Sequence, residues 1–261
     1  FGFALHPMKY ARELARLAQR SGAIIHAHSP VTGWSRKNGN HRLHTATGTL
    51  TAAKVLVATN GFTLDELHPA FDGCLLPGLS QVVATRALTD DELVAHDWSA
   101  ECGSLYDTRP MFSYFQMSLG RHLVLGSGGG LTGSPSSREN WKRFLARRVA
   151  QMFPEWRNVE ISHSWRGFWC MTRDALTHIG EVEADPGVFY SFAYHGNGVA
   201  MATWSGRAVA GLITGRSNTT VPATMTQPLR KFPIPVLRKW SIYWYFGMRL
   251  LKGMAREHLP I

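Results

Sequence analysis

The chain has 261 residues, an apolar fraction of 44% and a formal net charge of +10 at pH 7. This length allows one large domain or two small ones, and the apolar and aromatic content suits a globular core. No segment reaches the run of about 18 apolar residues that would span a bilayer, and no signal peptide opens the chain. Because the sequence begins at Phe1, in the middle of a pattern, we expect a fragment or a processed form of a cytoplasmic protein.

The first sixty residues combine one helix with short strands. The spacing of apolar residues predicts a helix from Met8 to Gln19, with Pro7 in its first turn. A strand is expected over residues 23–28, and a three-stranded meander with an Asn-Gly hairpin turn follows it. The short apolar run from Lys54 to Thr59 is typical of a buried parallel strand.

The middle of the chain has a different pattern. Antiparallel strands are expected at Leu79–Leu88, Met111–Met117 and His122–Gly126, followed by a helix at Arg138–Met152 and a further strand at Glu160–Phe168. An α/β layer interrupted by an antiparallel insert predicts an α/β (α+β) fold of two interleaved domains.

A glycine turn near the end of the folded region is the most informative motif. The apolar strand Val188–Ala193 runs into Tyr194–Val199, and a helix pattern continues to Thr214. Small residues at such a turn leave backbone N–H groups open to a ligand, and the start of the helix adds about half a positive charge. The turn therefore favours an anion or an electron-rich ring edge, with a ligand-free tight turn as the alternative.

Cysteine and histidine spacing supports neither disulfides nor a metal. Cys74, Cys102 and Cys170 form an odd count without C-x-x-C spacing, which favours free thiols in a reducing compartment. The twelve histidines include no H-x-x-x-H pair with a carboxylate, so no metal site is expected.

The positive charge is concentrated in the tail. Residues 205–261 hold nine basic residues and one glutamate, a net charge of +8, which leaves about +2 for everything before them. The tail interleaves these charges with aromatic residues. A helix docked on its own domain is the favoured interpretation, and contact with a membrane surface or with nucleic acid is the alternative.

Four stretches, in this order and at fitting separations, resemble one protein family. They are Leu5–Tyr10 (H-P-x-K-Y), Val55–Gly61 (V-x-A-T-N-G), Trp165–Gly180 (W-x-G, T-x-D and I-G) and His195–Val199 (G-x-G-V). They resemble the FAD-dependent amine oxidoreductases of the D-amino-acid oxidase and glycine oxidase superfamily, especially the gamma-glutamylputrescine oxidoreductase-like branch. The likeness covers most of the chain up to about Gly215.

The resemblance implies FAD as cofactor and assigns domains. A partial Rossmann-like FAD-binding domain is expected over residues 1–78 and 160–215, an antiparallel substrate domain over 79–159, and a basic aromatic tail over 216–261. The family's N-terminal βαβ unit, whose glycines hold the FAD pyrophosphate, has no counterpart in the sequence. We therefore expect residues 1–261 alone to hold FAD poorly and to be inactive.

The resemblance also implies contacts with the cofactor. Val31 would lie near the adenine, and the turn at residues 196–199 would meet the pyrimidine edge of the flavin, where N–H donors stabilise the reduced form. The full set of expected cofactor-binding residues is Val31, Ala58, Thr59, Asn60, Gly61, Gly167, Ile179, Gly180, Gly196, Asn197, Gly198 and Val199.

Two residues are candidates for the catalytic site. His195 would face the flavin or the substrate, with a turn histidine whose ring is satisfied as an equal alternative. Trp169 stands where amino-acid oxidases of the superfamily place an arginine for the substrate carboxylate, which favours an amine without an α-carboxylate. Cys170 is expected to be a buried inert thiol rather than an attachment point for FAD.

The implied reaction is the oxidation of an amine, such as a polyamine derivative or an N-alkyl amino acid. A hydride would pass to flavin N5, the imine would hydrolyse to an aldehyde, and oxygen would accept the electrons and yield hydrogen peroxide. Two alternatives remain open: a flavin domain of an RNA-modifying protein that uses the basic tail, and a non-catalytic remnant that binds a partner.

Overall fold

The computed structural model describes residues 4–98, 103–109, 112–129, 133–216, 219–238, 240, 241 and 244. The described chain forms two compact units. The antiparallel unit contains residues 78–168 and the described residues among 1–6 and 239–261, and the mixed unit contains residues 7–77 and 169–238. The second boundary lies after Phe168, whereas the sequence placed residues 160–168 in the cofactor domain. The reason is that the last strand of the insert pairs with the first and so belongs to the same sheet.

The antiparallel unit is a five-stranded sheet with the order β6-β7-β8-β5-β9. Its elements are β5 (Leu76–Thr85), α2 (Asp90–Ala95), β6 (Leu105–Tyr106), β7 (Tyr114–Met117), β8 (Leu123–Gly128), α3 (Pro135–Met152), the 3-10 turn η3 (Pro154–Trp156) and β9 (Ile161–Met171). The central strands are antiparallel, as the alternating pattern predicted.

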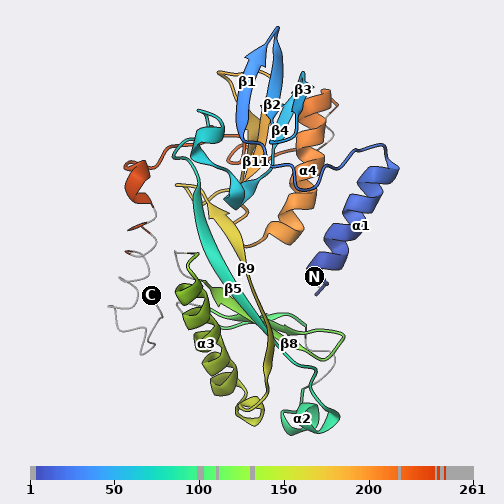
Figure 1. Cartoon of the computed structure of the whole chain (residues 1–261), viewed down its shortest axis with the longest axis vertical. Helices are drawn as coiled ribbons and strands as arrows, with labels where there is room; N and C mark the ends of the chain where they lie inside the picture. The colour runs from blue at the N-terminus through green and yellow to red at the C-terminus, as the bar shows by residue number, and fades with distance from the viewer. Residues whose placement is uncertain are drawn as a thin grey trace. The chain divides into compact units, whose positions relative to one another are not determined.

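Helix α3 covers one face of this sheet (Figure 1). Leu145 and Val149 of the helix pack against Val83, Leu123 and Leu125 of the sheet, and all five are buried. Burying each such side chain contributes roughly 1.5–3 kcal/mol, so this cluster stabilises the packing of α3 on the sheet. Ser134 begins the helix, and its side chain accepts a hydrogen bond from the Ser137 N–H.

The mixed unit contains two three-stranded sheets, β1-β2-β3 and β10-β11-β4. Its elements are α1 (Pro7–Arg20), β1 (Gly33–Lys37), β2 (Asn40–His44), β3 (Thr49–Ala52), β4 (Val55–Val57), the 3-10 turns η1 (Asn60–Phe62) and η2 (Asp65–Leu67), β10 (His178–Glu181), β11 (Val188–Phe192), α4 (Gly198–Thr214) and the 3-10 turn η4 (Pro235–Leu237). The expected helix, the meander and the strand–turn–helix are confirmed.

Strand β11 is the centre of the second sheet. It is antiparallel to β10 and parallel to β4, with Val188 opposite Val55 and Tyr190 opposite Val57. All five of its residues are buried, and α4 packs beside it (Figure 1). The parallel strand predicted at residues 54–59 is present as β4, which covers residues 55–57 at the edge of its sheet. The predicted burial holds for Val55 and Val57, whereas Leu56 is 40% exposed.

The expected strand at residues 23–28 is wrong. This segment has no regular structure, and Ile24 is 81% exposed. Its β-branched residues match a strand pattern, but none of the described strands pairs with them, and a strand without a partner is not stable in water. Within the described residues, no helix has the length and apolar character needed to cross a membrane. The expected tail helix lies mostly outside the described residues.

Candidate functional site

Two parallel strands of the mixed unit end side by side, and a turn follows each. After β4 the chain enters η1, which contains Asn60 and Gly61, and after β11 it enters the turn at residues 193–197. The side-chain oxygen of Asn60 accepts a hydrogen bond from the Ala193 N–H at 2.9 Å. This bond joins the two strand ends at the edge of an α/β sheet where ligands bind.

The second turn has an unusual backbone. Ala193, His195 and Gly196 have φ angles of 62°, 49° and 93°, in the left-handed region that residues with a Cβ rarely adopt. The turn ends at Asn197, whose carbonyl accepts the first helical hydrogen bond of α4 from the Met201 N–H at 2.9 Å. The left-handed residues thus reverse the chain from the strand into the helix within five positions.

The start of α4 is open and rich in donors. Asn197 makes no side-chain capping bond, so the N–H groups of residues 198–200 have the outward orientation of an uncapped helix start. A Cβ added at Gly196 would meet nothing within 4 Å, and one added at Gly198 would meet only Tyr194, at 3.6 Å. This end of the helix can therefore receive an anion or an electron-rich group close to the backbone.

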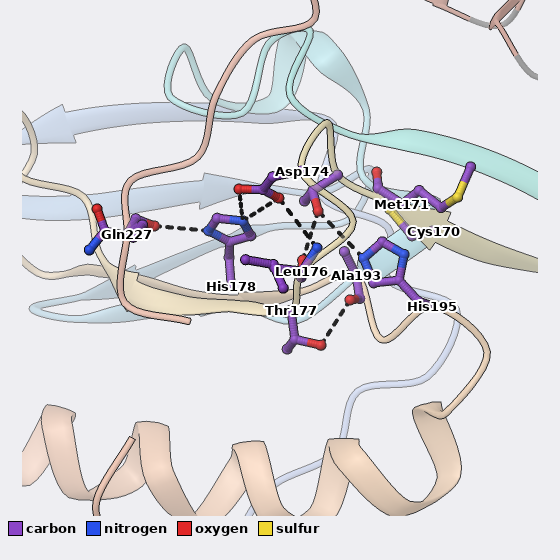
Figure 2. A network of polar contacts seen from close by, with 10 residues as sticks. Cys170, Met171, Asp174, Leu176, Thr177, His178, Ala193, His195 and Gln227 are labelled. Carbon is purple, nitrogen blue, oxygen red and sulfur yellow. Dashed lines mark hydrogen bonds and ion pairs between the residues drawn. The ribbon is translucent and has the colours of Figure 1, made fainter. Parts of the chain in front are cut away.

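A loop at residues 172–178 contacts the turn (Figure 2). The Thr177 hydroxyl donates to the Ala193 carbonyl at 3.0 Å. The Thr172 hydroxyl donates to the Leu176 carbonyl at 2.7 Å, and its oxygen lies 3.4 Å from Nε2 of His195. Because the one hydroxyl proton of Thr172 is used by Leu176, the histidine must donate from Nε2.

The pair of Asp174 and His178 fixes the loop at residues 172–178. Nε2 of the buried His178 lies 3.0 and 3.1 Å from the two oxygens of Asp174, and its Nδ1 lies 2.8 Å from the Gln227 carbonyl. Burial favours the protonated carboxyl, but the hydrogen bond and charge of His178 outweigh it and lower the pKa of Asp174. Asp174 also accepts the Leu176 N–H at 3.3 Å, so its contacts all serve the loop.

The environment of His195 disfavours the protonated ring. Burial lowers its pKa from the usual value, and contact with the Leu176 carbonyl opposes the effect only in part. The ring is half-buried and contacts Thr172, as expected for a turn histidine with a satisfied ring. These contacts tie His195 to the loop at residues 172–178, and the catalytic role expected for it stays a prediction.

The other predicted cofactor residues have varied environments. Ala58 and Thr59 are exposed beside Asn60, and Val31 is half-buried before β1. Ile179 is fully buried against α4, so its side chain supports the helix from inside the core.

Three predicted residues lie around β9 and β10. A Cβ on Gly180 would come within 2.9 Å of the Tyr190 hydroxyl. Gly167 is exposed on β9 in the antiparallel unit, whereas the half-buried Trp169 begins the second segment of the mixed unit.

Cys170 is buried and unreactive. Its side chain is 1% exposed, and burial raises its pKa to about 12. With this pKa, almost none of the thiol is ionised to thiolate at neutral pH. The thiolate is the form that reacts as a nucleophile. This environment agrees with an inert thiol.

Two aromatic side chains of the antiparallel unit, Tyr114 on β7 and Trp165 on β9, are partly exposed. The Tyr114 ring lies over Gly126, where an added Cβ would be 2.3 Å from Cζ, and its hydroxyl lies 2.6 Å from Oγ of Ser80. Burial raises the pKa of Tyr114. Trp165 on β9 is 47% exposed. A glycine within a strand often marks such a close approach, which is the one sequence signal for this feature.

Comparison with known proteins agrees with this geometry. Residues 2–212 match the family described as DAO, FAD dependent oxidoreductase. The chain belongs to this family. The cofactor of the family is FAD, and the resemblance drawn from four sequence motifs is confirmed.

The chain is also similar to individual DAO-family proteins. It is 29% identical to a probable oxidoreductase OrdL of Haemophilus influenzae over 215 residues, which cover 81% of this chain and 47% of that protein. It is 25% identical to the gamma-glutamylputrescine oxidoreductase of Escherichia coli over 217 residues, which cover 82% of this chain and 49% of that protein. The chain thus spans about half the length of the curated relatives that it matches.

Among solved structures, the glycine oxidase of Geobacillus kaustophilus shares the fold. The TM-score is 0.66 at 22% identity, and the match covers 85% of this chain and 57% of that one. The mixed α/β architecture with an antiparallel sheet is therefore the fold of DAO-family flavoenzymes.

The residues present fit one part of FAD. The uncapped start of α4 and the open space over Gly196 suit an electron-rich ring edge, and the neighbouring end of β4 presents Asn60 and Gly61. Asn197, Gly198 and Val199 are the residues that would hold this part of the cofactor, through backbone donors rather than charged side chains.

Proposed function

We propose that this chain is part of a flavoenzyme that oxidises an amine. The start of α4, at the ends of the parallel strands β4 and β11, carries this proposal, because family membership and local geometry agree there. FAD, when bound, accepts a hydride from the carbon beside the amine nitrogen, which gives an imine that water hydrolyses.

The contribution of the chain is binding and electrostatics. The N–H groups of residues 198–200 and the helix dipole supply positive potential without a titratable group, so their effect does not depend on pH. The small residues Gly196 and Gly198 keep Cβ atoms out of the space where a ring would approach. Burial lowers the pKa of His195, which disfavours a positive charge beside these donors, and its ring contacts Thr172.

We propose that the substrate is recognised as a cation. Trp169 cannot pair with a carboxylate, but an indole ring can stack on an ammonium group. Gamma-glutamylputrescine oxidoreductase, to which the chain is similar, is named for a polyamine derivative. We extend that substrate class to this chain and propose oxygen as the electron acceptor in a cytoplasmic enzyme.

The test uses the full-length gene product. We expect it to bind FAD, to consume oxygen with polyamine derivatives, and to release hydrogen peroxide. Simple D-amino acids and glycine should be slower substrates by kcat/KM. A protein that binds no FAD contradicts the proposed function, and faster turnover of glycine or D-amino acids contradicts the proposed substrate class.

A further inference from the structure

Ala193 has both of its backbone polar groups bound by side chains. The residue is fully buried and left-handed, with a φ of 62°. Its N–H donates to Asn60 at 2.9 Å, and its carbonyl accepts from the Thr177 hydroxyl at 3.0 Å. The two partners come from separate segments of the chain, so the turn is held from both sides.

A second contact holds the turn two residues further on. His195, also left-handed, donates from Nε2 to Thr172 at 3.4 Å. Thr172 is itself fixed by its bond to the Leu176 carbonyl. The backbone conformation of the turn is thus determined by three polar side chains and not by glycine alone.

The loop that carries Thr172 and Thr177 has its own support. Asp174 bonds the Leu176 N–H within the loop and pairs with the buried His178, which bonds the Gln227 carbonyl. A loop that is fixed in this way can hold another segment in place, whereas a mobile loop could not.

We propose that Asn60, Thr172 and Thr177 are positioning residues that hold the 193–196 turn in its left-handed conformation and so aim the N–H groups of residues 198–200 at FAD. This inference rests on the proposed function for the identity of the ligand. Without the three contacts, Ala193 and His195 would relax toward commoner backbone angles, and the start of α4 would shift with them.

The main variant is Thr177→Val, which keeps the shape of the side chain and removes its hydroxyl. Thr177→Ser restores the hydroxyl and serves as the rescue. Thr214→Val is the matched control, because it removes an exposed hydroxyl-to-carbonyl bond, 2.8 Å to Ala210, near the other end of α4. Asn60→Ala tests the opposite side of the turn, and Asn60→Asp keeps an acceptor there.

Two measurements are made on each variant. Amide hydrogen exchange over residues 193–201 is measured without FAD, and the flavin absorption spectrum and midpoint potential are measured with FAD bound. We expect Thr177→Val and Asn60→Ala to exchange about tenfold faster in this segment and to have a more negative potential. Thr177→Ser and Thr214→Val should match the unaltered protein in both.

Each contrary outcome is informative. Unchanged exchange in both Thr177→Val and Asn60→Ala overturns the inference, because the contacts then do not hold the turn. Faster exchange with an unchanged flavin spectrum and potential also overturns it, because the contacts are then only structural. If the unaltered protein binds no FAD, the proposed function fails, and the exchange data still decide whether these side chains hold the turn.

Discussion

A substitution at Gly198 tests most directly whether the turn before α4 binds a ligand or only connects the strand to the helix. A Cβ at this position would lie 3.6 Å from Cδ2 of Tyr194 and 3.9 Å from its Cβ, which is ordinary van der Waals contact. The fold therefore accommodates a Cβ at this position, and we expect Gly198→Val to change the free energy of unfolding by no more than about 1 kcal/mol, the range of helix propensities.

The effect on FAD should be far larger than the effect on folding. The valine side chain would occupy the open space before α4 and displace at least one N–H donor from the ligand. By analogy with oxyanion sites, one lost donor costs about 2–4 kcal/mol, which corresponds to roughly 30- to 1,000-fold weaker binding. The reduction potential should also become more negative.

The assay is calorimetric titration of the full-length apoprotein with FAD, with urea unfolding in parallel. Gly206→Ala is the control, since it lies within α4 and an added Cβ there meets nothing within 4 Å. It should stabilise the fold by about 1 kcal/mol and leave FAD affinity unchanged. If Gly198→Val folds and keeps the affinity and potential of the unaltered protein, the functional interpretation of this turn is wrong.

Three further predictions concern the fold and its titrating groups. The hydrogen bond from Arg86, followed by the Thr89 N–H, lowers the pKa of Glu92 to about 2, so this contribution to stability is complete above the unfolded pKa and is lost as the pH falls toward 2. Glu92→Gln should accordingly lower the unfolding free energy by about 1 kcal/mol at pH 7, as for a lost helix cap, and the difference should vanish near pH 2 in urea titrations at both pH values. Ile179→Ala should cost about 2–5 kcal/mol in urea unfolding because the side chain is fully buried against α4, and an unchanged stability would contradict the core role. Because burial raises the pKa of Cys170 to about 12, this thiol should react with iodoacetamide at pH 8 only after denaturation. Mass spectrometry measures the labelling, and a label on Cys170 in the native protein would refute the prediction.

Local patterns predicted the elements whose stability is mostly local. Helix spacing with Pro7 at its start predicted α1, and the Asn-Gly turn predicted the β1–β2 hairpin. The apolar run at Val55–Val57 also predicted a parallel strand, although its partner β11 is distant in sequence and only one face of the strand is buried. The segment at residues 23–28 shows that composition alone does not predict a strand. Its residues match a strand pattern, but it pairs with none of the described strands.

The candidate site could be found from sequence only in outline. The glycine turn was visible as a motif, and so was Asn60 at the end of β4. The bond between Asn60 and Ala193 joins residues 133 positions apart, and no local pattern indicates such a contact. The roles of Thr172 and Thr177 depend in the same way on tertiary placement, because threonines in a loop have no periodicity that marks them.

The pairing of β4 with β11 also determines the order in which the chain can fold. Val55 must wait for Val188, which the ribosome makes 133 residues later, whereas the β1–β2 and β7–β8 hairpins close over short distances as they emerge. The strands and helices of the antiparallel sheet, from β5 to β9, all lie within that interval and can fold before the mixed unit is complete. Among the described strands, the Val-Leu-Val segment thus meets its parallel partner only after about half of this chain has been made. A slowing of translation after β11, rather than before it, would favour correct closure of the parallel pair.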